Sequence, residues 1–402
     1  MTRILFHGGH VFDGTGSPPE RADVVVEDGH ILDIGIGLDG DESIELEGRT
    51  VLPGLFDCHV HFLYSGDLDT LRGAMRPFSL RYFEAIANMA ATLRTGITSV
   101  REASGSDLGV KTAVERGLVA GPRMQISIAM LSQTGGHGDQ TVPSGACFTW
   151  QHAYPGHPTG IVDGPEEMRR RVRELIREGA DVIKVATSGG VLSPRDDPRH
   201  GHFRDDELAV LVAEAEAAGR AVMAHAQATD GIKAAVRNGI RSIEHGIFLD
   251  DEAISMMLDR GTWLVPTLCA PRAVIAGAEA GMQLDAAVIR KAHEVLEIHS
   301  ESFRRAVDGG VKVAMGTDSG VGPHGRNLEE LGLMVEHSSM SPLDAWVATT
   351  SSAARLCGVD SRLGTVEPGK IADLTVLEGD LSDLNKLAER IWGVWKEGVR
   401  VV

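Results

Sequence analysis

The chain has 402 residues, of which 43 % are hydrophobic and 24 % are charged. These fractions are ordinary for globular proteins and exclude a disordered tail, a collagen-like repeat and a disulfide-stapled miniprotein. Because 57 acidic residues outnumber 39 lysines and arginines, the formal net charge is −18. We therefore expect neither nucleic acid nor an anionic membrane surface as a partner.

The cysteines and the start of the chain bear on the compartment. Four widely spaced cysteines form no CxxC pair, which indicates reduced, mostly buried thiols: Cys58, Cys147, Cys269 and Cys357. The first residues contain no apolar stretch typical of a secretory signal, and no segment reaches the roughly 18 apolar residues of a membrane span. We expect a cytoplasmic protein with no membrane segment.

Both ends of the chain predict short strands. Near the start, Asp28-Gly29 separates two β-rich runs, which is typical of a hairpin. From about Gly358 the chain again has β character, most clearly in LGTVEPGKIADLTVL at 363–377. We expect residues 1–54 and 358–402 to form one small β-sandwich domain.

Between these ends, residues 55–357 predict strands that alternate with helical stretches such as 165–178 and 205–217. The expected strands are 55–61, 97–102, 124–131, 181–187, 221–226, 241–245, 262–268 and 311–317. Eight such units predict an α/β fold, a TIM (β/α)8 barrel with insertions near 132–163 and 188–204. The alternative is a doubly wound open sheet, but no GxGxxG motif opens a helix to support a dinucleotide site.

The first barrel strand carries the strongest local motif, His59-Val60-His61. Because side chains alternate along a strand, both imidazoles point to the same face. At the carboxyl end of a barrel strand that face opens into the active-site mouth. The motif is weak alone, and its place in PGLFDCHVH (53–61) strengthens the prediction of a metal site.

Further polar residues stand at the ends of other expected strands: Lys184 in DVIKVA, His225 after AVMA, His245 in SIEHG and Asp318 in VAMGTD. Each has an ordinary explanation alone, as a hydrogen-bonded core histidine, a lysine with a buried carboxylate partner, or an aspartate that caps a turn. Six residues of ligand type at one barrel mouth favour a metal centre instead.

With these motifs the chain resembles the two-metal, carboxylated-lysine members of the amidohydrolase superfamily over nearly its whole length. The matching segments are PGLFDCHVH, the strand lysine, the two single histidines, TDSG (317–320) and the returning segment 363–377. SQTGGHGD (132–139), SGGVLSP (188–194) and RSIEHG (241–246) resemble more closely the Xaa-Pro dipeptidases and carboxypeptidase-like amidohydrolases.

The resemblance implies a binuclear metal centre. One divalent ion is expected on His59, His61 and Asp318, a second on His225 and His245, and a carboxylated Lys184 bridges both. Two dications would repel a protonated lysine, whereas its CO2 adduct is a carbamate anion with two oxygens. Such ligands suit Zn²⁺, with Mn²⁺ or Co²⁺ as alternatives.

The implied reaction is hydrolysis of an amide bond, in a peptide or an N-acyl amino acid, by a hydroxide that bridges the metals. Asp318 is then the general base, and His137 stabilises the oxyanion. The alternative for His137 is that it belongs to a flexible Gly-rich loop without a catalytic role. The substrate is a small molecule with a carboxylate held near Val191. We also expect Gln227 to contact substrate. It stands where dipeptidase-type relatives often have tyrosine, which argues against strict dipeptide specificity.

Other loop residues and other functions stay open. We expect His324 to contact substrate, whereas Arg195, His200, His202 and Arg326 are equally well explained as solvated loop residues. The alternatives are hydrolysis of a non-peptide amide, carbamate or lactone, a single-metal deaminase of the same superfamily, and a non-catalytic assembly protein on a decayed barrel. The deaminases usually lack the bridging lysine, and a decayed barrel loses ligands. We also expect a homo-oligomer.

Overall fold

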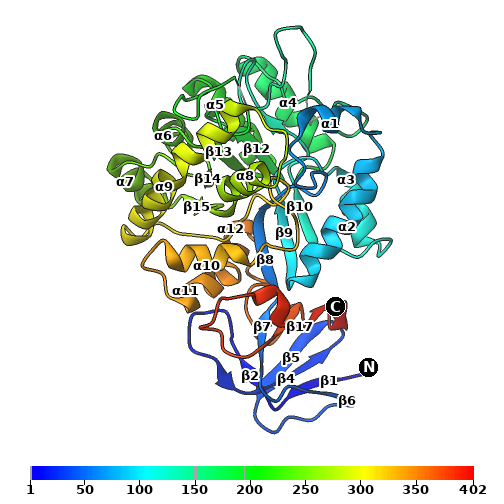
Figure 1. Cartoon of the computed structure of the whole chain (residues 1–402). Helices are drawn as coiled ribbons and strands as arrows, with labels where there is room; N and C mark the ends of the chain where they lie inside the picture. The colour runs from blue at the N-terminus through cyan, green and yellow to red at the C-terminus, as the bar shows by residue number, and fades with distance from the viewer. Residues whose placement is uncertain (1, 149–151, 194) are drawn as a thin grey trace.

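The computed structural model describes residues 2–148, 152–193 and 195–402. The predicted insertion 132–163 and the predicted motif that ends at Pro194 therefore include positions outside the described residues. Figure 1 shows a larger α/β part above a smaller β part, and both ends of the chain lie in the smaller part.

Parallel strands run through the larger part in chain order. They are β8 (Leu55–Val60), β9 (Ile97–Glu102), β10 (Arg123–Ile126), β11 (Met130–Leu131), β12 (Val182–Ala186), β13 (Ala221–Ala226), β14 (Ser242–His245) and β15 (Trp263–Val265). β8 to β10 form one sheet and β11 to β15 form another, and every neighbouring pair is parallel. The predicted strand order is therefore present.

Two of the predicted strands differ from the structure. The third, 124–131, is divided into β10 and β11 by a bend at Ile128, whose φ is 68°. The eighth, 311–317, is an extended segment rather than a regular strand. It still hydrogen-bonds to both neighbours, because Leu264 N donates to Lys312 O at 2.8 Å and Cys58 N donates to Met315 O at 2.9 Å.

Helices lie outside the parallel strands (Figure 1). They are α1 (Thr70–Met75), α2 (Leu80–Arg94), α3 (Leu108–Glu115), α4 (Pro165–Arg177), α5 (Asp205–Ala217), α6 (Thr229–Arg237), α7 (Asp251–Arg260), α8 (Cys269–Glu279), α9 (Ala286–Asp308), α10 (Glu329–Glu336), α11 (Pro342–Ala348) and α12 (Ser351–Cys357), with a 3-10 turn at Leu387–Arg390. The two helices predicted at 165–178 and 205–217 are confirmed as α4 and α5. In α4, proline occupies the first turn and a buried stripe of Met168, Val172 and Leu175 faces the core.

The smaller part contains two sheets built from both ends of the chain. Its strands are β1 (Ile4–His7), β2 (His10–Val11), β3 (Glu20–Arg21), β4 (Asp23–Glu27), β5 (His30–Gly35), β6 (Glu42–Glu45), β7 (Arg49–Pro53), β16 (Leu374–Glu378), β17 (Ile391–Lys396) and β18 (Val399–Arg400). One sheet has the order β5-β4-β1-β6 and the other β18-β17-β16-β7-β2-β3. The predicted hairpin is confirmed as the antiparallel pair of β4 and β5. Residues of both sheets, such as Phe6, Val26 and Trp395, share one buried cluster.

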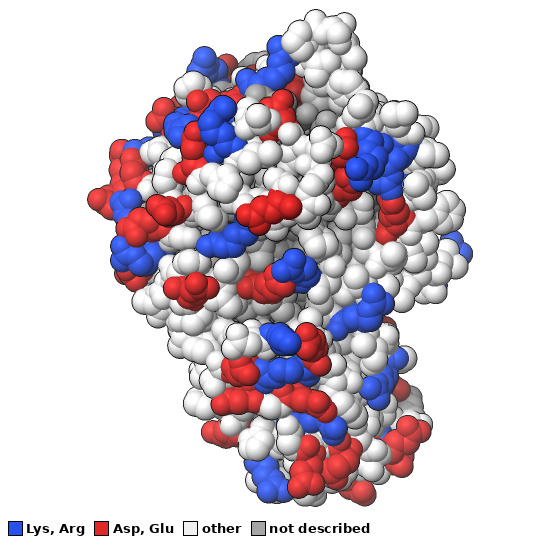
Figure 2. Space-filling view, viewed as in Figure 1, with Lys and Arg blue, Asp and Glu red and all other residues white. Residues whose placement is uncertain are grey.

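The surface and the thiols agree with the composition. On the face shown in Figure 2, acidic and basic side chains are interspersed over both parts of the molecule. All four cysteines are free, but the expectation that most of them are buried is wrong: Cys58 is buried, Cys269 and Cys357 are partly buried, and Cys147 is exposed. Among the described residues, no helix combines the length and the apolar character needed to cross a lipid bilayer.

Candidate metal centre and active site

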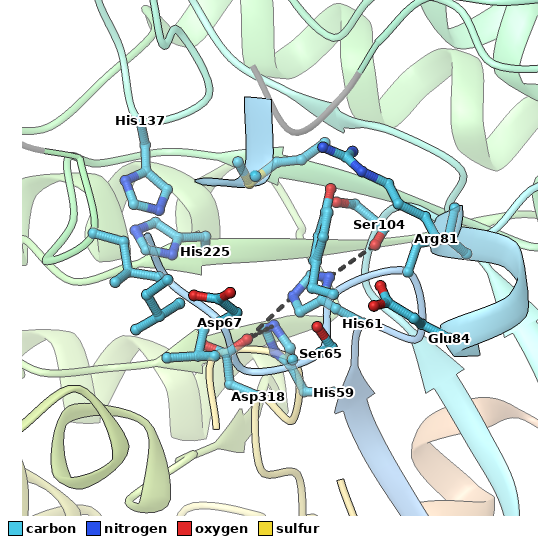
Figure 3. Close-up of a pocket in the computed structure, with 18 of the residues that line it drawn as sticks. His59, His61, Ser65, Asp67, Arg81, Glu84, Ser104, His137, His225 and Asp318 are labelled. Carbon is cyan, nitrogen blue, oxygen red and sulfur yellow. Dashed lines mark hydrogen bonds and ion pairs between the residues drawn. The ribbon is translucent and has the colours of Figure 1, made fainter. Parts of the chain in front are cut away.

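A cavity of about 930 Å³, counted out to its open mouth, lies at the carboxyl ends of the parallel strands. All of the side chains that the sequence predicts as metal ligands line it: His59, His61, Lys184, His225, His245 and Asp318. Four stand on β8, β12, β13 and β14, and the other two directly follow β8 and the 311–317 segment. The fold therefore brings together residues that are far apart in the sequence (Figure 3).

Several of these side chains meet at a common centre. His61 Nε2 lies 3.1 Å and His59 Nε2 lies 3.5 Å from Oδ1 of Asp318. Nζ of Lys184 lies 3.4 Å from Nε2 of His59. Ligand atoms of His59, His245 and Asp318 all lie within 4.8 Å of one another, a spacing that suits ligands of a metal ion.

Hydrogen bonds on the outer edges of the rings orient His59 and His61. Nδ1 of His59 donates to Oε2 of Glu244 at 2.8 Å, and Nδ1 of His61 donates to the backbone oxygen of Ser104 at 2.8 Å. A neutral imidazole that donates from Nδ1 keeps its lone pair on Nε2. His59 therefore presents an electron pair to the centre, which is the form that binds a metal. His61 does so once Nε2 gives up the proton that it shares with Asp318, whose Oδ1 lies 3.1 Å away.

A hydrogen bond from one ring nitrogen also orients each of the other two histidines. Nδ1 of His245 donates at 2.6 Å to Oγ1 of Thr267, whose own proton goes to the backbone oxygen of Pro266 at 2.7 Å. His225 is held through its other nitrogen, because Nε2 donates to the backbone oxygen of Gly189 at 3.1 Å. The ring nitrogens that stay available are Nε2 of His245 and Nδ1 of His225.

A buried ion pair beneath these rings was missed by the sequence analysis. Oε1 of Glu244 accepts from Nη2 of Arg101 at 2.8 Å and from Oγ of Ser242 at 2.6 Å. Strand alternation would send Glu244 and His245 to opposite faces. The φ of 73° at His245 interrupts that alternation, and both side chains reach His59, whose ring centroid lies 5.2 Å from that of His245.

Burial and neighbouring charge set the protonation of the centre. Burial lowers the pKa of Lys184 to about 8 and the pKa of His245 to about 3. It also holds the pKa of His59 well below its usual range. Burial raises the pKa of Asp318, but the nearby His59 and His61 outweigh this and the pKa is lowered overall. Burial lowers the pKa of His61, but its contacts with Asp318 outweigh this and raise it overall, so a divalent ion would displace a proton from this ring. Neutral His59 and His245 and an ionised Asp318 are the forms that bind divalent ions, so the donor set fits such a group.

His137 stands beside the predicted ligands, as the sequence analysis expects of an active-site residue. Its ring stacks on that of His225 with the centroids 4.1 Å apart, and its Nδ1 lies 2.7 Å from Oγ of Ser193. A Cβ on Gly190 would lie 2.3 Å from the His137 ring. A glycine at this position is therefore necessary for the two loops to approach so closely.

A smaller space of about 420 Å³, which we call the inner pocket, adjoins the cavity beside His225 and His245. Val191 and Gln227, both predicted to contact substrate, line it together with mainly apolar residues: Leu192, Ile247, Pro271, Val274 and Val321. Gln227 is 5 % exposed, and its Oε1 has no hydrogen-bond partner among the described residues. Within the part of the chain that the structure describes, no lysine or arginine lines the inner pocket.

The outer side of the cavity involves a region that the sequence analysis did not assign to the site. It is formed by α1, α2 and the segment that precedes them. Arg81 and Glu84 of α2 lie on the side of His61, opposite His137 and His225 (Figure 3). Arg76 also lines this side and pairs with Glu84. No motif or spacing marks these residues, because they line the cavity only through the packing of α2 and of the end of α1.

Several predicted loop residues lie elsewhere. His324 is behind the site, where its Nε2 lies 2.9 Å from the backbone oxygen of Tyr64 and 3.2 Å from that of His61, and it does not line the described walls of either space. The side chain of Arg195 donates to a backbone oxygen, and Arg326 pairs with Glu329. The described linings also do not include the remaining loop residues, His200 and His202.

The fold and the cavity define an α/β protein with a cluster of metal-ligand side chains at the carboxyl ends of its parallel strands. The amidohydrolase family model matches residues 50–401. The chain belongs to the amidohydrolase family.

Individual relatives agree with this assignment. The chain is 33 % identical to ochratoxinase of Aspergillus niger, over 98 % of this chain and 85 % of that protein. It is 33 % identical to a solved Xaa-Pro dipeptidase with bound methionine, with a TM-score of 0.90 and 99 % of both chains covered. A prolidase complexed with N-methylphosphonate-L-proline is 35 % identical, with a TM-score of 0.91, over 100 % of this chain and 99 % of that one.

These relationships confirm the predicted class of protein. The fold of similar amidohydrolases implies a TIM barrel with a separate domain, and the α/β part and smaller β part of this chain agree with it. The chain is an enzyme that acts on C–N bonds, and its activity is metal-dependent hydrolysis of an amide bond. A divalent metal is the cofactor that this family generally uses, and the cluster of His59, His245 and Asp318 is present to bind it.

Proposed function

We propose that the chain is a two-metal amidohydrolase. One metal ion would be held by His59, His61 and Asp318. The second would be held by His225 and His245, and a carboxylated Lys184 would bind both ions. The observation that carries this proposal is that all of these side chains line one cavity, while hydrogen bonds on the outer ring edges leave a nitrogen of each histidine available.

The chemistry of Lys184 supports its role as the bridge. The residue is 1 % exposed, and burial lowers its pKa to about 8, so a neutral amine that reacts with CO2 is accessible near neutral pH. The nitrogen and oxygen donors suit Zn²⁺, and Mn²⁺ or Co²⁺ would also fit, because metal choice depends on geometry and availability.

The residues around the centre suggest how they take part in hydrolysis. When bound, the divalent ions would acidify a water molecule and polarise the scissile carbonyl. Asp318, ionised and facing the cavity, takes the proton of the attacking water and passes it to the leaving nitrogen. His137 faces the centre from the opposite side, and its ring donates a hydrogen bond to the developing oxyanion.

The substrate that we propose is an amide of an amino acid, in a peptide or an N-acyl amino acid. Two similar structures support an amino-acid product, since one holds methionine and the other N-methylphosphonate-L-proline. The name of the Aspergillus relative, ochratoxinase, adds hydrolysis of a toxin to the activities found in similar proteins. The mainly apolar lining of the inner pocket suits a small molecule with an apolar group.

The charges of the two spaces suggest how the substrate is oriented. A carboxylate placed near Val191 would lie in the inner pocket, whose described lining has no cationic lysine or arginine, and an unpaired buried charge is strongly unfavourable. The outer side carries guanidinium groups together with carboxylates, those of Arg76, Arg81, Asp67, Asp69 and Glu84. Arg76 pairs with Glu84, and Arg81 is the cation that we assign to the substrate. We therefore place the substrate carboxylate near Arg81, and the apolar group near Val191 and Gln227.

Metal analysis combined with a substrate screen tests this function. We expect two equivalents of metal per chain and hydrolysis within a panel of dipeptides, N-acyl amino acids, carbamates and lactones. Lys184→Ala should lower both metal content and turnover, whereas Lys396→Ala, at a lysine of β17 that donates to the backbone oxygen of Gly121, should leave both unchanged. Full metal content and activity in Lys184→Ala would refute the bridge.

The same experiment separates the alternative functions. A single-metal deaminase would bind one equivalent and release ammonia from a cyclic or aromatic substrate. An assembly protein would hydrolyse nothing in the panel, even when loaded with metal. Hydrolysis of carbamates or lactones without hydrolysis of amino-acid amides would keep the metal centre and change only the substrate class.

Two structural expectations accompany the proposal. We propose that the 311–317 segment closes the barrel between β15 and β8, which its backbone hydrogen bonds to Leu264 and Cys58 support. We also propose the domain boundaries 1–54 with 358–402, and 55–357, in line with the pairing of β7 with β16. Association of the chain into a homo-oligomer stays a prediction.

A further inference from the structure

Glu244 and Arg101 lie beneath the metal centre and are not among its ligands. We propose that Glu244, held in place by Arg101, is a positioning residue that fixes His59 for metal binding. The inference rests on the proposed metal centre, and it adds a requirement that the ligand residues alone do not contain.

The hydrogen bonds of Glu244 are complete and directional. Its Oε2 accepts from Nδ1 of His59 at 2.8 Å, while its Oε1 accepts from Arg101 at 2.8 Å and from Ser242 at 2.6 Å. Glu244 is 0 % exposed and Arg101 is 2 % exposed. Because both groups are buried from solvent and every carboxylate oxygen has a protein donor, these bonds hold the carboxylate in one orientation, which orients the imidazole in turn.

Arg101 connects the carboxylate to the strand that carries His59. Its Nε donates to the backbone oxygen of Cys58 at 2.9 Å, and its Nη1 donates to Oγ of Ser242 at 2.9 Å. The guanidinium group therefore links β8, β9 and β14. A buried carboxylate also needs a compensating charge, which Arg101 supplies.

The consequence for His59 is specific. A carboxylate on Nδ1 fixes the tautomer with the lone pair on Nε2, and it increases the basicity of that nitrogen toward a cation. Nε2 is the atom that lies 3.5 Å from Asp318 and 3.4 Å from Lys184. Loss of the carboxylate should therefore weaken metal binding and change the ligand field, and should not merely loosen the core.

The test uses the whole enzyme with a matched control. Glu244→Gln keeps the shape and an acceptor oxygen but removes the charge. The control is Asp373→Asn, which removes the charge from another buried carboxylate. Asp373 directly precedes β16 and pairs at 2.7 Å with the partly exposed Arg123. Zinc affinity is measured by competition with a chelator, the visible absorption of the Co²⁺-loaded enzyme reports ligand geometry, and thermal unfolding of the metal-free protein reports stability.

We expect Glu244→Gln to bind zinc roughly 10- to 100-fold more weakly and to shift the Co²⁺ spectrum. Asp373→Asn should change neither, even if it lowers the unfolding temperature. Wild-type zinc affinity and an unchanged Co²⁺ spectrum in Glu244→Gln would overturn the proposal. A fall in thermal stability alone, without a change in zinc affinity or in the spectrum, would also overturn it.

A second variant covers a failure to fold. Arg101→Met combined with Glu244→Met removes both buried charges together, which proteins often tolerate. It should again bind zinc more weakly than wild type, and wild-type affinity would overturn the proposal. Failure of the proposed function is distinguishable, because it would be seen in the wild-type enzyme as an absence of amide hydrolysis or of a second metal.

Discussion

Lys184 should destabilise the metal-free protein, although it is proposed as a central part of the site. The residue is 1 % exposed, and burial lowers its pKa from 10.5 to about 8. A lowered pKa means that the folded state holds the proton less tightly than the unfolded chain does. We predict that Lys184→Met, which keeps a similar apolar stem and removes the charge, stabilises the metal-free protein at neutral pH.

The magnitude follows from the shift. A difference of one pKa unit corresponds to about 1.4 kcal/mol, so the change from 10.5 to about 8 corresponds to about 3 kcal/mol. Well below pH 8 the amine is protonated in both states and the full penalty applies, while near pH 7.5 a minor fraction of the folded protein is neutral and nearly all of the penalty remains. Between pH 8 and 10.5 the unfolded chain binds more protons than the folded one, so stability rises with pH. Above pH 10.5 both states are neutral and the penalty is absent.

Urea denaturation of chelator-treated protein in CO2-free buffer measures this effect. At pH 7.5 the free energy of unfolding of Lys184→Met should exceed that of wild type by about 3 kcal/mol. The difference should shrink as the pH rises toward 10.5. Lys386→Met, at a lysine whose side chain is 77 % exposed, should show no such difference. A variant that is no more stable than wild type at pH 7.5, or a difference that does not change with pH, would refute the reasoning.

Three further variants test the proposed catalytic and binding roles. Asp318→Asn should lower kcat by roughly 10²- to 10⁴-fold because the proton acceptor is lost, measured with each variant's metal content. His137→Ala should lower kcat by about 10²- to 10³-fold at unchanged metal content, and an unchanged kcat would exclude it as the oxyanion donor. Arg81→Met should lower kcat/KM at least about tenfold for N-acyl amino acids and little for their carboxamides. An equal loss of kcat/KM on N-acyl amino acids and on their carboxamides would refute the proposed contact between the substrate carboxylate and Arg81.

The sequence predicted the ligand-type side chains well because their positions follow from the fold. Once strands alternate with helices, their carboxyl ends gather at one mouth, and polar residues at those ends must meet. Lys184 and His245 could be assigned to that mouth without knowing any contact between them. The same reasoning needs only strand order, which the parallel pairing from β11 to β15 confirms.

Contacts perpendicular to the strands could not be predicted in this way. The bond from His59 to Glu244 joins residues 185 positions apart, and the bond from Arg101 to Glu244 joins residues 143 positions apart. Each depends on the side-chain orientation within the barrel rather than on strand order. Arg81 could not be predicted as a site residue for a related reason, because a helix that packs over the mouth contributes residues without any local motif.

Backbone strain explains why regular alternation fails at the strand ends. His245 and Asp318 have φ values of 73° and 60°, in the left-handed region that non-glycine residues avoid at a cost of about 1–2 kcal/mol each. Hydrogen bonds hold the strain in place, because Asp318 N donates to the backbone oxygen of His59 at 2.8 Å and Gly246 N donates to that of Ala226 at 3.1 Å. Thr267, which holds the His245 ring, also has a positive φ, of 54°. Strain at three neighbouring strand ends is what a site requires when it directs more side chains toward its centre than alternation allows.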